Sequence, residues 1–283
     1  MKEGGLRIQG FFRQSKPELP LLSIVMVTWN AETHFRQALE SVIAQDYPNK
    51  EILIIDGGST DATLRIVSEF EDSIDYWLSE PDLGIYDAMN KGILLSRGDW
   101  IGFKNADDWY AQGAFSHLLD CIHRYPEVGL WYGNSYSVIQ EQPLKVAPFF
   151  TDHHSLGASP GIDHRSSFVR TDAHKGHLFD LKFRLAADLD VFWRLKKNGL
   201  LFRHTGSFMA YKRFGGASDG TAILKESFRI NARYAGYWYA VRSVLESRLR
   251  FIFWKTGNAV LLFLLGQKAY HRFKARKIKS GTS

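Results

Sequence analysis

Residues 21–103 alternate between two hydrophobic patterns, and few folds accommodate such an alternation. Short apolar runs rich in β-branched residues predict buried strands at Leu21–Val27, Glu51–Asp56, Tyr76–Ser79 and Trp100–Phe103. The segments between them carry apolar residues at helical spacing, and the last of these helices is predicted from about Ile85 to Ser96. Alternation at this spacing predicts an α/β fold with a mostly parallel sheet and helices on both faces.

Polar clusters follow three of the predicted strands. TWNAE comes after the first strand, DGGSTD ends the second, and NADD follows the fourth. Because the carboxyl ends of parallel strands meet at one edge of a sheet, where ligands bind in such folds, we expect the three clusters to converge. The sequence contains neither G-x-G-x-x-G nor G-x-x-x-x-G-K-[ST], so a nucleotide at this edge needs another way to hold its phosphates.

The cluster after the fourth strand offers oxygen ligands for a cation. Asn105, Asp107 and Asp108 carry the hard oxygens that suit Mg²⁺ or Mn²⁺. Such an ion would relieve the repulsion between the carboxylates and neutralise a diphosphate. The alternative is an acidic turn that caps a helix beginning near Gln112. Asp56 is equally open, since it can bind a base or ribose or cap the following helix.

The second half of the chain is less regular. Residues 129–150 predict strands or long loops, and Leu185–Asn198 predicts a helix with Asp188 and Asp190 near its start. Residues two apart face different sides of a helix, so one carboxylate can face a cleft and act as a general base while the other caps or pairs. Both can equally be favourable charges at a helix start.

The charge of the chain is unevenly distributed. The formal net charge is +6, but residues 241–283 contain ten Lys or Arg and one Glu and carry +9, which leaves −3 for residues 1–240. A basic tail on a mildly acidic body indicates an anionic partner for the tail, and we expect no nucleic-acid binding. The single cysteine, Cys121, lies in an apolar helical pattern, which predicts a buried thiol in a reducing compartment.

Seven stretches, taken in order, resemble the family 2 glycosyltransferases. They are SIVMVTWNAE, EILIIDGGSTDAT, SEPDLGIYDAMNKGI, GDWIGFKNADDWY, HRSSFVR, FRLAADLDVFWRL and GGAS. The likeness covers about residues 21–220 and is closest to bacterial enzymes that build surface or secreted polysaccharides. Each fragment is a weak signal, but the ordered set is specific. The resemblance implies a GT-A fold, Rossmann-like, and transfer of a sugar, usually from a UDP-sugar, with inversion at the anomeric carbon.

The resemblance also assigns residues to the donor. The residues matched to nucleotide binding are Thr28, Asn30, Glu32, Asp56, Asp61, Asp82, Tyr86, Asn90, Lys91 and Asn105. Asn105 and Asp107 occupy the outer positions of the family's D-x-D motif, which implies that Asp107 binds Mn²⁺ or Mg²⁺. Asp108 then supports the donor sugar or the metal shell. Asn105 replaces the first acid of the motif and carries no charge, which predicts a lower metal affinity.

On the acceptor side, Asp188 matches the acid of a Glu-Asp pair that acts as the base. Ala187 replaces the Glu of that pair, which leaves the choice between Asp188 and Asp190 open. The residues expected near the donor sugar or the acceptor are Asp108, His164, Arg165, Asp190, Gly215 and Gly216. The loop Gly215–Ser218 is expected to close over the donor.

These assignments predict an N-terminal arm (1–20), a GT-A catalytic domain (21–218) and a helical tail (219–283). The catalytic domain divides into a nucleotide-sugar half (21–110) and an acceptor half (111–218). The predicted function is metal-dependent, inverting transfer of a hexosyl group from a nucleotide sugar to a hydroxyl of a glycan or lipid-linked glycan. The alternative, which Asn105 and Ala187 favour, is an inactive nucleotide-sugar-binding module of a polysaccharide assembly complex.

The tail FIFWKTGNAVLLFLLGQKAYHRFKARKIK is apolar in its middle and basic on both flanks. Phe251–Leu265 is 15 residues long and includes Lys255, which is shorter than the ~20 apolar residues of a membrane span. An amphipathic helix on anionic headgroups is expected, and a helix packed on the body is the alternative. The first twenty residues lack the apolar core of a secretory signal. These features predict a cytoplasmic protein, peripheral on the inner face of the cell membrane.

Overall fold

The computed structural model describes residues 1–141, 144–149, 162–213 and 222–248. The strands are β1 (Lys2–Gly4), β2 (Leu22–Thr28), β3 (Lys50–Asp56), β4 (Tyr76–Ser79), β5 (Trp100–Asn105), β6 (Trp109–Tyr110), β7 (Leu130–Glu141), β8 (Leu144–Phe149), β9 (Ser167–Arg170) and β10 (Phe202–Arg213). The helices are α1 (Phe35–Ile43), α2 (Thr63–Glu69), α3 (Ile85–Leu95), α4 (Ala114–Arg124), α5 (Thr171–Lys175), α6 (Ala187–Lys197) and α7 (Ala222–Ala235), with 3₁₀ turns η1 (Glu71–Ser73) and η3 (His164–Ser166).

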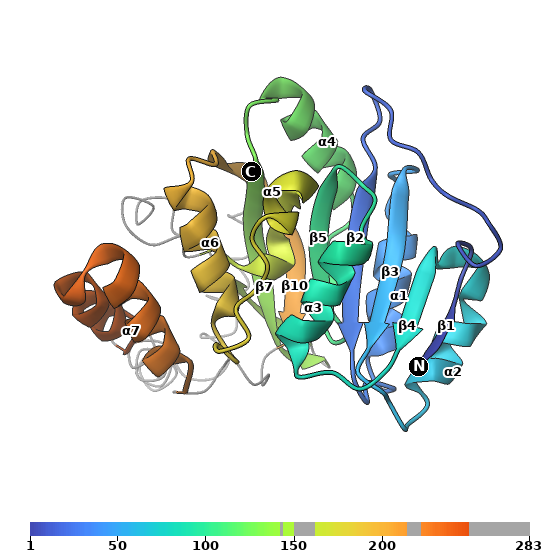
Figure 1. Ribbon diagram of the computed structural model, residues 1–283, viewed down its shortest axis with the longest axis horizontal. Helices are drawn as coiled ribbons and strands as arrows, with labels where there is room; N and C mark the ends of the chain where they lie inside the picture. Colours follow the sequence, from blue (N-terminus) through green and yellow to red (C-terminus); the bar gives the residue numbers. More distant parts are fainter. Residues whose placement is uncertain (142–143, 150–161, 214–221, 249–283) are drawn as a thin grey trace, which may run out of the picture. The chain divides into compact units, whose positions relative to one another are not determined.

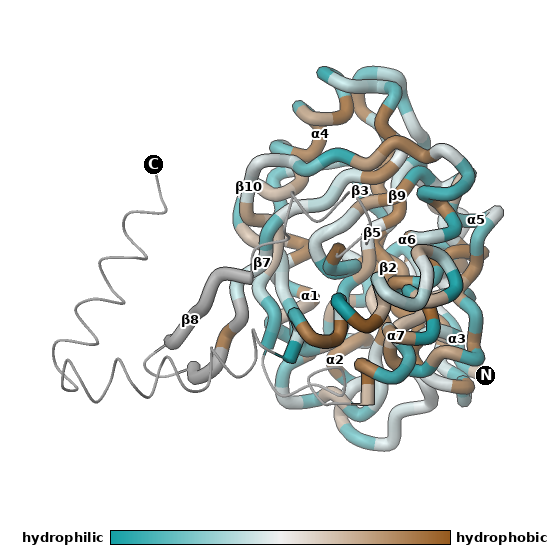
Figure 2. Tube along the Cα trace, turned by 90° about the vertical axis from the view of Figure 1, so that its left-hand side faces the viewer, coloured by the Kyte–Doolittle hydropathy of each residue, from teal (hydrophilic) through white to brown (hydrophobic). Residues whose placement is uncertain are grey.

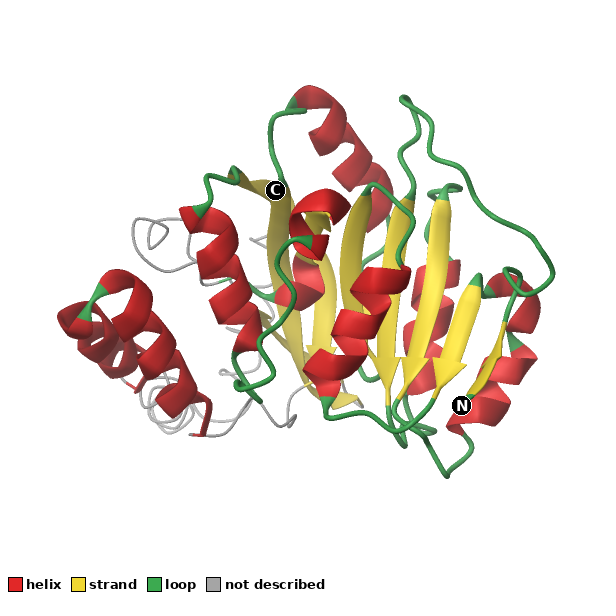
Figure 3. Cartoon of the chain, in the orientation of Figure 1, coloured by secondary structure: helices red, strands yellow, loops and turns green. Residues whose placement is uncertain are grey.

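One sheet joins the strands in the order β1-β4-β3-β2-β5-β9-β7-β10-β6, with β8 beside β7. From β4 to β5 every neighbouring pair is parallel, and the arrowheads of β2, β3 and β4 end at one edge of the sheet in Figure 3. Beyond β5 the directions mix, since β9 is antiparallel to β5 and β7 whereas β7 and β10 are parallel. The predicted α/β fold is confirmed, and its parallel block ends in the predicted polar clusters.

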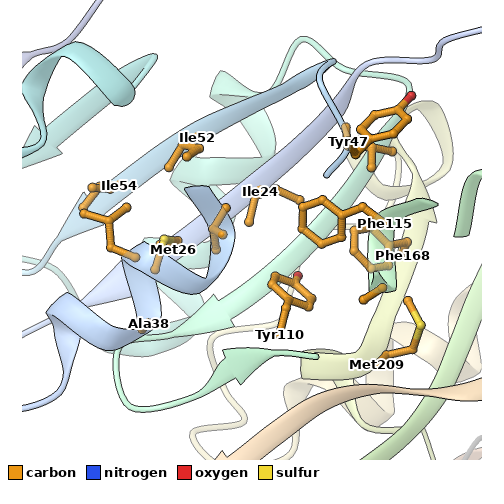
Figure 4. Packing of buried hydrophobic residues seen from close by; sticks show 14 of the residues in the cluster. Ile24, Met26, Ala38, Tyr47, Ile52, Ile54, Tyr110, Phe115, Phe168 and Met209 are labelled. Atoms are coloured by element: carbon orange, nitrogen blue, oxygen red, sulfur yellow. The ribbon is translucent and has the colours of Figure 1, made fainter. Parts of the chain in front are cut away.

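Helices cover both faces of the sheet, as predicted. Alternate strand residues point to opposite faces, so Ile24 and Met26 join a core with α1, α2 and α4. Figure 4 shows part of this core from close by. Val25 and Val27 join a second core with α3 and α6 on the other face. In Figure 1, α3, α5 and α6 lie in front of the sheet and α1 and α2 lie behind it.

Helix α4 packs on the sheet through one side only. Phe115 and Leu118 are buried, and brown and teal segments alternate along α4 in Figure 2, as expected of an amphipathic helix. Cys121 is half-buried against the same core, whereas full burial was predicted. Its partial burial raises the pKa of the thiol.

Close packing fixes the position of α3, which carries part of the segment matched to the nucleotide. A Cβ atom at Gly92 would lie only 2.2 Å from Cγ1 of Val25 in β2. Any side chain at this position would therefore push the helix away from the sheet. The glycine thus lets α3 lie against β2 and holds the preceding loop beside the strand ends.

The N-terminal arm is attached to the outer side of β4, the last strand of the parallel block. Most of residues 1–20 are irregular, as expected, but β1 forms an edge strand antiparallel to β4. Arg7 pairs with the buried Glu51 at 2.5 Å, and Arg13 pairs with the buried Asp75 at 2.7 Å. The arm belongs to a compact unit that spans Met1–Glu226.

The second compact unit, Ser227–Ser283, is helical where it is described. Helix α7 is followed by Gly236, whose φ of 93° breaks the helix, and residues 237–248 are again helical. The apolar and basic stretch 251–279 lies outside the described residues. Among the residues described, no helix is both long enough and apolar enough to cross a bilayer.

Candidate active site

The carboxyl ends of the parallel strands carry aligned polar residues. Thr28 pairs in register with Asp56, Asp56 with Ser79, and Val27 with Asn105. Neighbouring strands lie about 5 Å apart, so the three polar clusters lie side by side at one edge of the sheet. The Thr28 hydroxyl is buried at this edge and has no hydrogen-bond partner within the described part of the chain. The predicted convergence of the clusters is confirmed.

The loops after β2 and β3 are joined by reciprocal hydrogen bonds. Asn30, with a left-handed φ of 46°, donates from its backbone N–H to Ser59 and accepts from Thr60 through its side chain. The side chain of Glu32 accepts from the backbone N–H of Ala62 at 2.9 Å, and Asp61 accepts from that of Glu32 at 3.1 Å. These side chains, predicted to bind the nucleotide, thus shape the two loops. Their direct contact with a donor stays a prediction.

Asp56 is buried at the end of β3 and organises the turn that follows. Its Oδ2 accepts from the backbone N–H groups of Gly58 at 3.1 Å and Ser59 at 2.9 Å. The Ser79 hydroxyl of the neighbouring strand donates to the same oxygen at 2.7 Å. The carboxylate therefore caps the turn, so a base or ribose bound here would share its oxygens with these donors.

Asp82 and Trp29 meet over Gly57. A Cβ atom at Gly57 would lie 2.6 Å from Oδ2 of Asp82 and 3.4 Å from Cδ1 of Trp29, so both side chains lie close to this glycine. Trp29 is 67% exposed although it is large and aromatic. Trp29 is not among the residues predicted to bind the donor, although an aromatic residue inside the polar cluster TWNAE is a signal that the sequence contains. An exposed ring at a nucleotide edge is a candidate stacking surface for a base.

Asn90 and Lys91, both predicted to bind the donor, have protein partners. The Asn90 side chain donates to the Phe179 carbonyl at 3.0 Å and accepts from the Phe179 N–H at 2.8 Å, which ties α3 to the segment before α6. Lys91 pairs with Glu80 at 2.9 Å and with Asp87 at 3.5 Å. In the structure, both side chains are therefore bonded to other parts of the protein. Their contacts with the donor stay predictions.

Besides the Thr28 hydroxyl, Asp107 and Asn105 carry oxygen atoms at this edge that lack partners among the described residues. Asp107 is half-buried and makes no hydrogen bond or ion pair with any described residue. The side-chain N–H of Asn105 donates to Asp108 at 3.1 Å, which leaves its buried Oδ1 without a partner among the same residues. One carboxylate and one amide oxygen fit a Mg²⁺ or Mn²⁺ ion whose other ligands are phosphate and water. No group of three or more His, Cys, Asp and Glu arranged for a metal occurs within the described ranges.

Asp108 and Arg165 belong to a buried ionic cluster. Arg165 pairs with Asp163 at 2.7 Å and lies 3.7 Å from Asp108, and the Lys104 ammonium donates to the Arg165 carbonyl at 2.9 Å. Burial raises the pKa of Asp108 and lowers that of Lys104 to about 7. Burial also opposes the charge of Asp163, but Arg165 outweighs it and holds the pKa of Asp163 well below its usual range. Through Asp108, the cluster anchors the loop that carries Asp107. Contact of Arg165 or Asp108 with a substrate stays a prediction.

Asp188 and Asp190 differ in exposure and in their partners. The side chain of Asp188 is 21% exposed, whereas that of Asp190 is 2% exposed and pairs with Arg194 at 2.8 Å. His164 Nδ1 lies 2.9 Å from Asp188 Oδ2, and the Tyr86 hydroxyl donates to Oδ1 at 3.3 Å. Because a carboxylate only accepts, His164 carries its proton on Nδ1. Burial first, and then the Asp188 charge, raise the pKa of Tyr86 well above its usual value, so Tyr86 remains a donor.

Glu226 at the start of α7 holds the segment that leads into α6. Ala186, the residue before α6, makes no side-chain cap. Instead the Glu226 carboxylate accepts from the backbone N–H groups of Arg184 at 3.0 Å, Leu185 at 2.8 Å and Ala186 at 3.0 Å. These bonds fix the entry to the helix that carries Asp188. Nothing local in the sequence marks Glu226, because its partners lie about forty residues away.

Gly215 and Gly216, in the loop expected to close over the donor, lie outside the described residues. The closure of this loop over the donor therefore stays a prediction.

The α/β fold of this chain is that of the GT-A glycosyltransferases. The structure of S. aureus TarS (residues 1–349) in complex with UDP-GlcNAc has a TM-score of 0.60, with 17% identity, and covers 74% of this chain and 65% of that chain. The mannosyltransferase PcManGT from Pyrobaculum calidifontis, in complex with GDP-Man and Mn²⁺, has a TM-score of 0.59, with 14% identity, over 95% of this chain and 88% of that one. These likenesses show the fold.

Sequence comparison gives the family. The model of glycosyl transferase family 2 matches residues 23–178, which is more than half of the chain. A PGL/p-HBAD biosynthesis glycosyltransferase of Mycobacterium bovis is 31% identical over 215 residues, which cover 73% of this chain and 82% of the relative. An uncharacterised glycosyltransferase of Mycobacterium tuberculosis is 31% identical over 180 residues, 62% of this chain and 68% of the relative. The chain belongs to glycosyl transferase family 2.

Replacing Glu226 tests the support of α6. Glu226→Ala leaves three backbone N–H groups without their acceptor, and we expect it to lower the free energy of unfolding by about 1–2 kcal/mol. Glu226→Gln keeps one acceptor oxygen and should lose less. The control Glu69→Ala removes only the exposed ion pairs with Arg36 and Arg65 and should change stability by less than about 1 kcal/mol. Urea denaturation measures all three, and equal stability of Glu226→Ala and Glu69→Ala would refute the role given to Glu226.

Proposed function

We propose that the protein is a metal-dependent, inverting glycosyltransferase that moves a sugar from a UDP-sugar to a hydroxyl of a glycan or lipid-linked glycan. The main support is one arrangement: the loops after β2, β3 and β5 share an edge of the sheet. Tyr86, from the segment matched to the donor, is hydrogen-bonded to Asp188 and so links this edge to the candidate base. A donor and an acceptor can therefore meet between Asp107 and Asp188.

The donor is proposed from the strand-end loops and from the structural neighbours. TarS has been solved with UDP and with UDP-GlcNAc, and PcManGT with GDP-Man and Mn²⁺. At this edge the Thr28 hydroxyl and Asn105 Oδ1 lack partners among the described residues and are free to bond a nucleoside. The exposed ring of Trp29 supplies a flat apolar surface beside them.

A divalent cation is proposed at Asp107. When bound, it would neutralise charge on the diphosphate and so improve the leaving group. Asp107 would hold it through a carboxylate oxygen, with Asn105 Oδ1 beside it. The buried cluster of Asp108, Arg165 and Asp163 keeps the loop that carries Asp107 in place.

Asp188 is proposed as the general base. As the acceptor oxygen attacks the anomeric carbon, Asp188 takes the proton of that hydroxyl, and the bond between the sugar and the diphosphate breaks on the opposite face. The configuration of the anomeric carbon is therefore inverted. Hydrogen bonds from Tyr86, His164 and the backbone N–H of Leu189 hold the Asp188 oxygens in place for this step.

Asp188→Asn tests the base and also the alternative, an inactive nucleotide-sugar-binding module. Asn cannot take a proton, so turnover should fall by about 10²–10⁴-fold while UDP binding is unchanged. The control Asp172→Asn lies on the exposed surface and should keep turnover. UDP release from the donor with a glycan acceptor is the measurement. Normal turnover of Asp188→Asn would exclude it as the base, and no UDP release from the wild type with any acceptor would favour the inactive module.

Asp107→Asn tests the metal. In the wild type, Mn²⁺ should raise the thermal stability gained with UDP, because the ion adds a link between the diphosphate and the protein. Asp107→Asn should lose at least about tenfold in Mn²⁺-dependent UDP affinity, and the exposed control Asp72→Asn should not. A wild-type UDP affinity that is the same in EDTA and in Mn²⁺ would contradict metal dependence.

Membrane attachment through residues 251–279 is proposed from the sequence alone, because this stretch lies outside the described residues. The full chain should float with vesicles containing anionic lipid, because Lys and Arg near the surface contribute about 1 kcal/mol each. A chain that ends at Arg248 should bind more weakly. Equal flotation of the two would refute a membrane role for the stretch, and with it the proposed location on the inner membrane face.

A further inference from the structure

A cavity of about 330 Å³ lies between the loop before α3 and the segment before α6. Residues 82–87 form one wall, and Leu181, Phe183 and Arg184 form the other. The side chains at its rim are apolar and open to solvent: Leu83 is 83% exposed, Leu181 is 40% exposed, and Ile85 is exposed as well. Exposed leucines scattered singly need no explanation, but here they gather around one cavity.

The cavity adjoins both parts of the candidate active site. At one end, Asp82 touches Gly57 in the loop after β3. At the other end, Tyr86 lines the cavity and donates its hydroxyl to Asp188. The Tyr86 side chain therefore lies between a group that fills the cavity and the proposed base.

Two hydrogen bonds fix the shape of the loop before α3, and the Leu83 side chain of this loop is exposed. The backbone N–H of Gly84 donates to Asp82 at 2.8 Å, and the backbone N–H of Leu83 donates to Asp87 at 3.1 Å. These bonds close the turn on the protein side and leave the Leu83 side chain in solvent. A preformed apolar surface binds a ligand with less loss of conformational entropy than a mobile one does.

The charges of the cavity indicate which substrate it takes. Among the described residues that line it, Arg184 is the single cation beside the carboxylates of Asp82 and Asp87, so the cavity has no excess positive charge to hold a diphosphate. The base of a nucleotide sugar already has a candidate surface at Trp29, and its diphosphate and sugar are charged or covered with hydroxyls, so they gain little from Leu83, Ile85 and Leu181. The acceptor is the substrate that can bring an apolar group to this place.

We propose that this cavity binds the apolar aglycone of the acceptor, an alkyl or aryl group linked to the sugar whose hydroxyl faces Asp188. The inference rests on the proposed transferase function and names the class of its acceptor. A glycolipid or aryl glycoside would place its apolar part against Leu83 and Leu181. An acceptor that is sugar alone would leave the cavity unfilled.

Octyl glucoside and methyl glucoside are the probes, because they share a sugar and differ in the apolar chain. Below its micelle concentration, octyl glucoside should bind the wild type at least about tenfold more tightly than methyl glucoside, since each buried methylene favours binding. The double variant Leu83→Ser with Leu181→Ser should lose this preference. Leu94→Ser, a change at an exposed leucine of α3 away from the cavity, should keep it. Saturation-transfer NMR and titration calorimetry measure both ligands.

The proposal is overturned if octyl and methyl glucoside bind the wild type equally, or if the double variant keeps the preference. UDP affinity, measured on the same samples, should be unchanged in the double variant and confirms that it is folded. If the wild type does not bind UDP, that result counts against the proposed transferase function. The comparison of the two glucosides still tests the cavity by itself.

Discussion

The candidate site depends on the register of β2 between its two neighbours. Backbone hydrogen bonds pair Thr28 with Asp56 on one side and Val27 with Asn105 on the other. A slip of one residue would turn every side chain of β2 to the opposite face. Ile24 would then leave the core under α1 and Val25 the core under α3, so the packing of both cores holds the register. The same packing that stabilises the fold therefore aligns the polar strand ends.

Above this aligned edge, the polar groups divide into two kinds. Asp56, Glu32 and Asp61 are occupied by backbone N–H groups and shape the loops. Asp107, Asn105 Oδ1 and the Thr28 hydroxyl lack partners among the described residues, and the last two are buried. An unpaired buried polar group costs about 1–3 kcal/mol, so a ligand that bonds these atoms restores what folding left unpaired. The side chains that shape the loops thus have hydrogen-bond partners within the protein, whereas these three groups have none among the described residues. Such an arrangement is suited to binding a ligand.

The sequence predicted those features that arise from local pattern. Strand β4 and helix α3 agree with their predicted ranges to within a few residues, because apolar periodicity and flanking turns define them. The three-residue edge strand β1 has no such pattern and was missed. The Glu226 bonds to Arg184–Ala186, the Asn90 clamp on Phe179 and the Arg165 cluster join residues far apart in the chain, so no local signal could have revealed them.

Hydrogen–deuterium exchange with UDP and Mn²⁺ tests whether the loops after β2, β3 and β5 form one nucleotide site. If they do, exchange should slow together in peptides covering residues 28–32, 56–61 and 105–108. Peptides at the opposite edge of the sheet, around α4 and the start of β7, should not change. Protection of one loop alone, or protection at that opposite edge, would contradict a shared site.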